Sequence, residues 1–300
     1  MNKPLPDRIQ KIDVEDGFQV WSRSLGGGAP AERTPLLIIH GGPGVPHQYL
    51  DNLAALATPT QRVIFYDQLG CGWSDLPDDP DRWKMARFVK EVDCVRTALG
   101  LNEVAILGQS WGGMLAIEYA LQQPAGLAGM ILSNTSPSAR LLADESQKLL
   151  QALPAATLST IAKHEAAGTT DHPEYLQAMG EFYGRHVVRV HPLPDVVQYS
   201  FDHIGEPYGV MWGPNEFTLN GNLAPWNRIA DLDQIQCPIL LICSEHDECT
   251  PAIHQLMHDK MPPSRLVILE GCSHLSHVEQ PEIYMQFVQH FLDQLAGPSR

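Results

Sequence analysis

Short apolar runs that alternate with stretches of helical periodicity constrain the fold of this chain more than any other feature. The runs hold four to six residues each, at 35–39, 62–66, 104–107, 129–132, 238–243 and 265–269. Unbroken hydrophobicity over such a length is typical of strands buried on both faces, as in a parallel sheet. Helical stretches lie between and after the runs, at 87–99, 114–122 and 281–295. The alternation predicts a doubly wound α/β domain with a mostly parallel sheet.

The two ends of the chain add detail to this expectation. Residues 9–14 and 18–21 alternate in hydrophobicity around a turn at 15–17, which predicts an N-terminal antiparallel hairpin. Near the other end, the helical stretch places Ile283, Phe287, Val288 and Phe291 along one stripe, which we expect to face the core.

One long section does not follow the alternation. Residues 136–232 contain no run of the buried-strand type; helical patterns fill 139–167, and Pro, Gly and aromatic residues are frequent at 191–226. We interpret 136–232 as a helical cap, inserted between a first core part (1–135) and a second (233–300). At the carboxyl edge of the strands, such a cap would cover the crevice where α/β sheets bind ligands.

Charge and targeting signals exclude several classes of function. The 300 residues include 20 Lys+Arg and 35 Asp+Glu, for a net charge of −15. Such a chain repels phosphate backbones and anionic membrane surfaces, so we expect neither nucleic acid nor a membrane as partner. The start, MNKPLPDRIQ, lacks the apolar core of a signal peptide, and the six cysteines show no CxxC pair. Reduced thiols in a cytoplasmic protein are the simplest interpretation.

Residues 108–112 read Gly-Gln-Ser-Trp-Gly and match the pattern G-x-S-x-G. The pattern alone is common, but here it follows the apolar run 104–107 and precedes the helical stretch 114–122. A nucleophile elbow requires this strand–turn–helix setting, and its glycines let strand and helix approach closely. The start of the helix also favours developing negative charge. We therefore predict Ser110 as a nucleophile rather than a serine in an ordinary Gly-rich turn.

A nucleophilic serine needs a base and an acid that orients it, and here the acid precedes the histidine in the chain. His274 stands in a Gly-containing loop after the last apolar run. After the run 238–243 the candidates for the acid are Glu245, Asp247 and Glu248, of which we favour Asp247. Both loops follow carboxyl ends of strands, at the same edge of the sheet as Ser110.

An oxyanion hole needs two backbone N–H donors. One is expected from Trp111, the residue after the nucleophile. The other is expected from the loop after the run 35–39, which reads His-Gly-Gly-Pro-Gly at 40–44. Glycines there would let the backbone approach a substrate carbonyl.

Other reactive residues are weaker candidates for a metal site or a nucleophile. His254 and His258 have the spacing of a metal-binding pair on a helix, but HQLMH lacks the glutamate of HExxH, so we interpret them as a solvated helix face. Cys272 lies near His274, but a cysteine nucleophile would leave the serine elbow without a role. We therefore expect no metal and no organic cofactor.

Taken together, the motifs resemble the prolyl aminopeptidase (proline iminopeptidase) family of α/β-hydrolases over nearly the whole chain. The matching segments are HGGPG at 40–44, DQLGCGWSD at 67–75, GQSWGGMLAIEYAL at 108–121, GPNEF at 213–217, HDECTP at 246–251 and GCSHLSHVEQPE at 271–282. The resemblance implies an α/β-hydrolase fold with Ser110, Asp247 and His274 as a catalytic triad. It also implies the amides of Gly42 and Trp111 as the oxyanion hole.

The resemblance further implies a site for a free α-amino group, which the family holds with carboxylates from the cap and from the loop beside the catalytic acid. In this chain those positions carry Glu216 and Glu248. An ammonium that enters a pocket loses hydration and needs charge-assisted hydrogen bonds, and two nearby carboxylates repel each other until a cation arrives.

Two departures bear on the substrate. Leu69 replaces an arginine common in bacterial members, and the loop 45–50 reads VPHQYL. Both are similar to the branch that contains broad-specificity aminopeptidases and amino-acid amidases. The first residue of the substrate could therefore be proline or another small or apolar residue.

The predicted function is that of a serine hydrolase that releases an N-terminal amino acid from short peptides or amino-acid amides through an acyl-enzyme. The expected partner is thus a small molecule or short peptide with a free amino terminus. The main alternative is a carboxylesterase or lactonase that acts on neutral acyl compounds. A non-catalytic ligand receptor of the same fold is a third interpretation, against which the complete set of Ser110, Asp247 and His274 argues.

Overall fold

The computed structural model describes residues 5–29 and 32–295. The predicted core parts also include residues 1–4, 30–31 and 296–300, which lie outside the described residues. None of the described helices combines the length and the apolar character that crossing a membrane requires.

The centre of the molecule is an eight-stranded sheet with the order β1-β2-β4-β3-β5-β6-β7-β8. Its strands are β1 (Asp7–Asp13), β2 (Gln19–Leu25), β3 (Leu36–Ile39), β4 (Val63–Tyr66), β5 (Val104–Gln109), β6 (Leu127–Ser133), β7 (Ile239–Ser244) and β8 (Ser264–Leu269). β2 pairs antiparallel with β1 and β4, and the remaining neighbours pair parallel. The predicted fold class, a mostly parallel sheet with an antiparallel hairpin at the start, is confirmed.

The apolar runs are explained by burial on both faces of this sheet. In β3, Leu37 and Ile39 pack on one face, and Leu36 and Ile38 pack on the other. The first face is covered by α1 (Met85–Ala98), α2 (Trp111–Ala120) and α8 (Pro251–Lys260). The second is covered by the 3₁₀ segment η2 (His47–Leu56) and α10 (Pro281–Leu295). Three shorter segments, η1 (Glu15–Gly17), η3 (Pro80–Arg82) and α9 (Ser276–Glu279), complete the core.

The predicted stripe of α10 is partly wrong. Val288 and Phe291 are buried as expected, but Ile283 is 44% and Phe287 36% exposed. The helix is instead rotated so that Tyr284 and Leu292 join the buried side. The two candidate stripes share Val288 and Phe291, so the pattern of apolar residues could not distinguish them.

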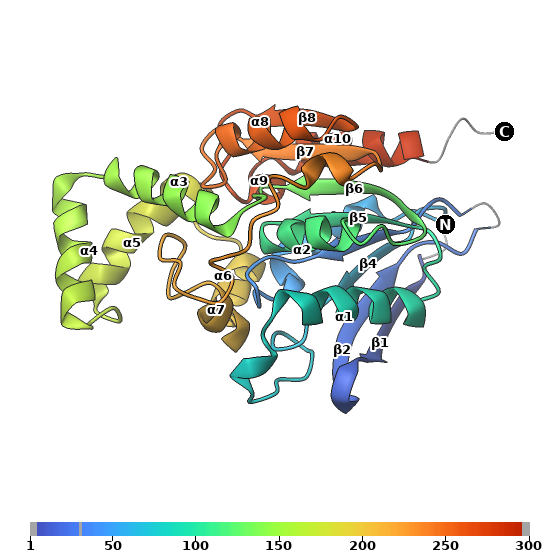
Figure 1. The fold of residues 1–300 in the computed structure, drawn as a ribbon, viewed down its shortest axis with the longest axis horizontal. Coiled ribbons are helices and arrows are strands. Elements are labelled where there is room, and N and C mark those ends of the chain that lie inside the picture. The colour runs from blue at the N-terminus through green and yellow to red at the C-terminus, as the bar shows by residue number, and fades with distance from the viewer. Residues whose placement is uncertain (1–4, 30–31, 296–300) are drawn as a thin grey trace.

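Between β6 and β7 the chain leaves the sheet and forms a group of helices at one side of the molecule (Figure 1). They are α3 (Ala139–Gln151), α4 (Ala155–Ala167), α5 (Pro173–His186), α6 (Asp195–Asp202) and α7 (Glu206–Met211), followed by η4 (Leu232–Gln234). We call residues 136–232 the cap; the limits of this segment as a separate unit stay a prediction.

The cap is held by two kinds of packing. Its outer helices form a cluster of their own, which includes Ile161, Phe182 and Phe217. The last part of the cap, residues 206–226, packs instead with the core. Its buried residues in the core cluster are Tyr208, Met211, Trp212, Leu223 and Trp226. The cap is therefore anchored most firmly near the carboxyl edge of the sheet, where the predicted site residues lie.

Candidate active site

Ser110 stands at a sharp turn between β5 and α2, with φ 56° and ψ −123°. The backbone packs so closely here that the positions of the neighbouring glycines have no space for a side chain. A Cβ on Gly108 would lie 2.3 Å from the Gly112 carbonyl oxygen, and one on Gly112 would lie 2.1 Å from that of Ile39. The strained backbone of a non-glycine residue is typical of a functional turn. The geometry is that of a nucleophile elbow.

His274 and Asp247 form a buried pair at the ends of β8 and β7. The Nδ1 atom of His274 lies 2.8 Å from Oδ1 of Asp247, and both side chains are almost fully buried. Of the three candidate acids, Glu245 is exposed and accepts the Gly271 amide instead. Asp247 is therefore the acid that contacts the Nδ1 side of the imidazole.

The elbow and the histidine loop lie next to each other. Gln109, directly before the serine, donates from Nε2 to the His274 carbonyl at 3.3 Å. In the described part of the chain, Ser110 Oγ makes no hydrogen bond to His274. Catalytic hydrogen bonds are often long before substrate binds and shorten in the complex.

The charge state of His274 is set by opposing effects. Burial lowers the pKa of His274, but the charge of Asp247 and its hydrogen bond outweigh burial, so the pKa lies above the usual value. A raised pKa makes the imidazole a better proton acceptor, and Asp247 stabilises the imidazolium that results.

The two amides expected to form an oxyanion hole are free to do so. Trp111 is the first residue of α2, and the first N–H groups of a helix have no acceptor within the helix. The Gly42 amide has no hydrogen-bond partner among the described residues, whereas the Gly41 amide donates to the Tyr49 hydroxyl. A Cβ on Gly41 would lie 3.1 Å from the Cβ of Ser110, so this loop passes close to the elbow.

Glu216 and Glu248 meet beside His274, one from the cap and one from the core. Oε1 of Glu248 lies 3.7 Å from Nε2 of His274, and Oε2 is buried without a partner in the described structure. Burial raises the pKa of Glu248 well above its usual value, and the charges of Glu216 and Asp247 raise it further. Burial also raises the pKa of Glu216, against the opposing effect of His274. Among the described residues, no Lys or Arg forms an ion pair with either carboxylate, and the imidazole of His274 is the nearby group that can carry positive charge.

The cap closes over this pair through contacts that the sequence did not indicate. The carbonyl oxygen of His186, at the end of α5, accepts the amides of both Glu248 (3.3 Å) and His274 (3.2 Å). The hydroxyl of Tyr208 lies near Glu216 and is buried with no partner in the described part of the chain. Backbone acceptors carry no sequence signature, so His186 could not have been found by motif.

Asn134 is a second residue that sequence reasoning missed. It directly follows β6 and donates from Nδ2 to Oδ2 of Asp247 at 2.7 Å. The available signal was its position, because polar residues that follow a buried strand lie at the same edge of the sheet as the nucleophile.

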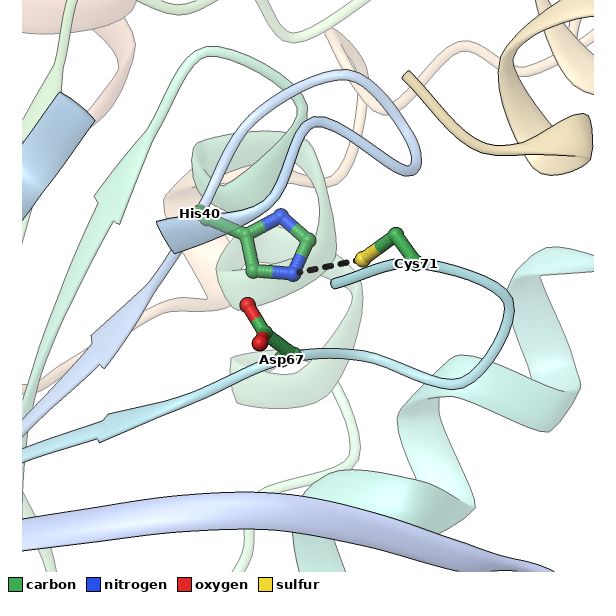
Figure 2. Close-up of side chains that lie close together, drawn as sticks. All are labelled: His40, Asp67 and Cys71. Atoms are coloured by element: carbon green, nitrogen blue, oxygen red, sulfur yellow. Dashed lines mark hydrogen bonds between the residues drawn. The ribbon is translucent and has the colours of Figure 1, made fainter. Parts of the chain in front are cut away.

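His40, Asp67 and Cys71 form a buried set with the donor types of a metal site (Figure 2). Nε2 of His40 lies 3.5 Å from Cys71 Sγ, but it also accepts the Gln68 amide at 2.9 Å, which occupies the lone pair that a metal needs. Burial lowers the pKa of His40 to about 4 and raises that of the Cys71 thiol well above its usual value. We therefore interpret these three side chains as part of a hydrogen-bonded network that stabilises the loop 40–44.

Two more donor sets are engaged in hydrogen bonds and ion pairs of their own. In one, Asp247 and His274 already bind each other. In the other, the buried His164 lies with the exposed His172 and Glu174, and Lys163 Nζ is 2.9 Å from the Glu174 carboxylate. Neither set offers a free group of ligands.

The remaining reactive residues are structural. The expectation of a solvated face is wrong for His254, which is fully buried because α8 turns it toward the sheet, where Nε2 lies 3.3 Å from the Thr135 amide. His258 is partly buried and lies 2.9 Å from the Ser264 hydroxyl. Burial raises the pKa of Cys272 to about 12, so this residue is a neutral thiol.

The comparisons with known proteins show the family to which the chain is similar. Residues 34–281 match the model of the alpha/beta hydrolase fold family. A proline iminopeptidase of Lactobacillus helveticus (strain DPC 4571) is 37% identical over 282 residues, which cover 93% of this chain and 95% of that protein.

Two solved structures are similar over almost their whole length. The crystal structure of the proline iminopeptidase of Mycobacterium smegmatis has a TM-score of 0.89 at 40% identity and covers 96% of this chain and 99% of its own. That of VinJ has a TM-score of 0.92 at 35% identity and covers 97% and 100%. The chain therefore belongs to the proline iminopeptidase family of α/β-hydrolases.

Proposed function

We propose that this protein is a serine hydrolase that releases the first amino acid from peptides or amino-acid amides with a free amino terminus. The observation that carries the proposal is the position of Glu248. One carboxylate oxygen lies 3.7 Å from Nε2 of His274, and the other is buried without a partner among the described residues. An acceptor for a cation thus stands directly beside the candidate base. Proline iminopeptidases among the relatives support the same substrate class.

In the proposed first half-reaction, Ser110 Oγ attacks the carbonyl carbon of the first residue, and Nε2 of His274 accepts the serine proton. Asp247 holds the Nδ1–H tautomer through its 2.8 Å contact and stabilises the imidazolium. The amides of Gly42 and Trp111 donate to the developing oxyanion.

Acylation ends when the C–N bond breaks and His274 gives its proton to the leaving amine, so that the acyl group remains on Ser110 as an ester. A water molecule then attacks the ester, and His274 accepts its proton. When the second tetrahedral intermediate collapses, the bond from the carbonyl carbon to Ser110 Oγ breaks, and His274 returns the proton to Oγ, which releases the amino acid and restores the serine. Apart from the attacking water molecule, each proposed step uses side chains and backbone amides of this chain.

The ammonium of the substrate is proposed to bind between Glu216 and Glu248. Burial raises the pKa of both carboxyl groups, and the charge of Glu216 raises that of Glu248 further. An ammonium that binds between them removes this repulsion. A neutral acyl group gains nothing from this pair and leaves it uncompensated. The pair therefore selects substrates with a free amine and sets the distance from that amine to the reacting carbonyl.

A substrate panel tests the proposal. Aminoacyl-arylamides of proline, alanine and leucine are compared with their N-acetylated forms, and we expect turnover of the free amines only. Fluorophosphonate labelling of the wild type and of Ser110→Ala shows whether Ser110 is the activated serine. Equal rates on free and acetylated arylamides would instead favour an esterase or lactonase, and absence of both labelling and turnover would favour a ligand receptor.

A further inference from the structure

The backbone at Asn134 is held in an uncommon conformation next to the candidate triad. Asn134 has φ 49°, and its amide donates to the Ile242 carbonyl of β7 at 2.8 Å. Asparagine adopts left-handed φ more readily than most residues because its short polar side chain forms local hydrogen bonds. The position restricts which side chains fit there without strain.

The orientation of the side-chain amide follows from its partners. Oδ1 accepts two hydroxyl groups, from Ser133 at 2.8 Å and from Ser276 at 3.0 Å. The Tyr284 hydroxyl donates in turn to Ser133 Oγ at 3.0 Å. A carboxylate can only accept, so Nδ2 faces Asp247 and donates to Oδ2 at 2.7 Å. Nδ2 also lies 3.1 Å from Ser244 Oγ and 3.4 Å from the Ser273 carbonyl oxygen.

The two oxygens of Asp247 are supported unequally. Oδ1 lies 2.8 Å from His274 Nδ1 and accepts the Cys249 amide at 2.9 Å. In the described structure, Oδ2 has the Asn134 amide as its only hydrogen-bond donor. Asp247 and Asn134 are both buried, so solvent does not replace a donor that is lost. One of the two ends of the carboxylate thus depends on a single side chain.

From this dependence we propose that Asn134 is a positioning residue, which holds the Asp247 carboxylate so that Oδ1 stays directed at His274. The inference rests on the proposed function, because it assigns Asp247 and His274 their roles in catalysis. Asn134 does not touch the reacting atoms. It acts on Asp247, by fixing the rotation of the carboxylate and by stabilising its negative charge.

Asn134→Gly is the first test, because glycine accepts the left-handed backbone and removes only the side chain. Without the donor, the negative charge of Asp247 loses a hydrogen bond, and the carboxylate attracts the Nδ1 proton of His274 more strongly. We expect kcat to fall roughly 10- to 100-fold, by analogy with residues that orient metal ligands, with little change in KM. The acid limb of kcat/KM should move to higher pH, so the ratio of variant to wild type rises with pH.

Asn134→Asp is the second test and keeps the size of the side chain. When the introduced carboxyl group is protonated, its O–H can donate to Asp247 as the amide did. When it ionises, two carboxylates face each other and repel. The ratio of variant to wild-type kcat/KM should therefore fall with rising pH, opposite to the trend for Asn134→Gly.

Gln123→Gly is the matched control, because Gln123 is exposed and also has a positive φ, of 52°. It should change neither kcat nor the pH profile. If both Asn134 variants keep wild-type kinetics, or lose activity by a factor that does not vary with pH, Asn134 is only structural and the proposal is wrong.

Nuclear magnetic resonance separates this proposal from the proposed function. The Nδ1 proton and ring nitrogens of His274 can be titrated without any substrate. In Asn134→Gly we expect the imidazolium to persist to higher pH than in the wild type. An unchanged titration would overturn the role of Asn134, whereas absence of fluorophosphonate labelling in the wild type would overturn only the hydrolase assignment.

Discussion

The edge of the sheet and the cap contribute to the site in opposite ways. At the sheet edge, both oxygens of Asp247 have donors, and His274 is fixed by its carboxylate. Beneath the cap, Glu216 and Glu248 have raised pKa values, and one oxygen of Glu248 has no partner in the described structure. A site with satisfied hydrogen bonds is organised before substrate arrives, as catalysis requires. Under the proposed function, the carboxylates beneath the cap are compensated only when a substrate that carries positive charge binds.

The packing of the two regions follows the same division. The sheet lies between two large clusters of buried side chains, which hold the strand ends rigidly. The outer cap has a smaller cluster of its own. It meets the catalytic loops through the end of α5, where the His186 carbonyl binds the amides of Glu248 and His274. In the proposed function, the core supplies the reacting groups, and the cap and the core each supply one carboxylate of the ammonium site.

The largest effect is expected at the sheet edge. Ser110→Ala removes the attacking oxygen, and loss of a catalytic serine costs roughly a million-fold in kcat by precedent. Turnover of an aminoacyl-arylamide and fluorophosphonate labelling should both disappear. The control is Ser159→Ala, at an exposed serine of α4, which should leave both unchanged. Turnover by Ser110→Ala at a rate near the wild type would mean that another residue is the nucleophile.

A moderate effect is expected at the carboxylate pair. Glu216→Gln removes one charge from the ammonium site, and a hydrogen bond to a charged group is worth about 1.5–3 kcal/mol. We expect kcat/KM for free amines to fall roughly ten- to a hundredfold, mainly through KM, with labelling of Ser110 preserved. Asp171→Asn, at an exposed acid of the cap, is the matched control. Unchanged KM in Glu216→Gln would reject the role of this residue.

A smaller effect is the dependence of KM on pH. The pKa values of Glu216 and Glu248 are raised by burial, so the pair takes up protons at a higher pH than ordinary glutamates do. Since protonation removes the charge that binds ammonium, KM should rise as pH falls through that range. Glu216→Gln removes the neighbour that raises the pKa of Glu248, so the rise in KM should start at lower pH. Identical midpoints in both proteins would contradict the pairing.

The smallest effect is expected where the cap returns to the core. Glu118 of α2 accepts Trp226 Nε1 at 2.8 Å and Arg228 Nη2 at 2.8 Å. Glu118→Gln should lower the free energy of unfolding by about 1 kcal/mol, because the pair is partly exposed and screened, and should leave kcat/KM nearly unchanged. Denaturant unfolding measures this change in the free energy of unfolding, and Glu282→Gln, at an exposed position, is the control. A large loss of kcat/KM would show that this anchor also positions the site.

The sign of the pH dependence checks the same contact. Burial raises the pKa of Glu118, but Arg228 and Trp226 outweigh it, so the pKa lies below the usual value. The stability from this contact is therefore present above the ordinary pKa of glutamate and is lost as pH falls through the lowered pKa. The difference between wild type and Glu118→Gln should disappear in acid. A constant difference would mean that shape rather than charge is responsible.

Much of the fold and the candidate triad could be predicted from the sequence, because both depend on local patterns. Apolar runs marked the parallel strands. Gly108, Ser110 and Gly112 marked the turn, because the close packing of strand and helix there leaves no space for a Cβ at either glycine. His274 followed from its place after the last strand. The errors at α10 and His254 arose where a helix could present either of two adjacent faces, which only packing against the sheet resolves.

By itself, the sequence determined which residues leave the carboxyl ends of the strands, and hence the edge at which the chemistry lies. Only the tertiary structure decided which of these residues touch. It brought Asp247 rather than Glu245 to the Nδ1 side of His274, placed Asn134 behind Asp247, and brought Glu248 beside His274. The physical reason is the distance along the chain over which each kind of interaction acts. Hydrophobic periodicity and turn chemistry act over a few neighbouring residues, whereas these contacts join segments far apart in the chain that meet only when the sheet and the cap pack together.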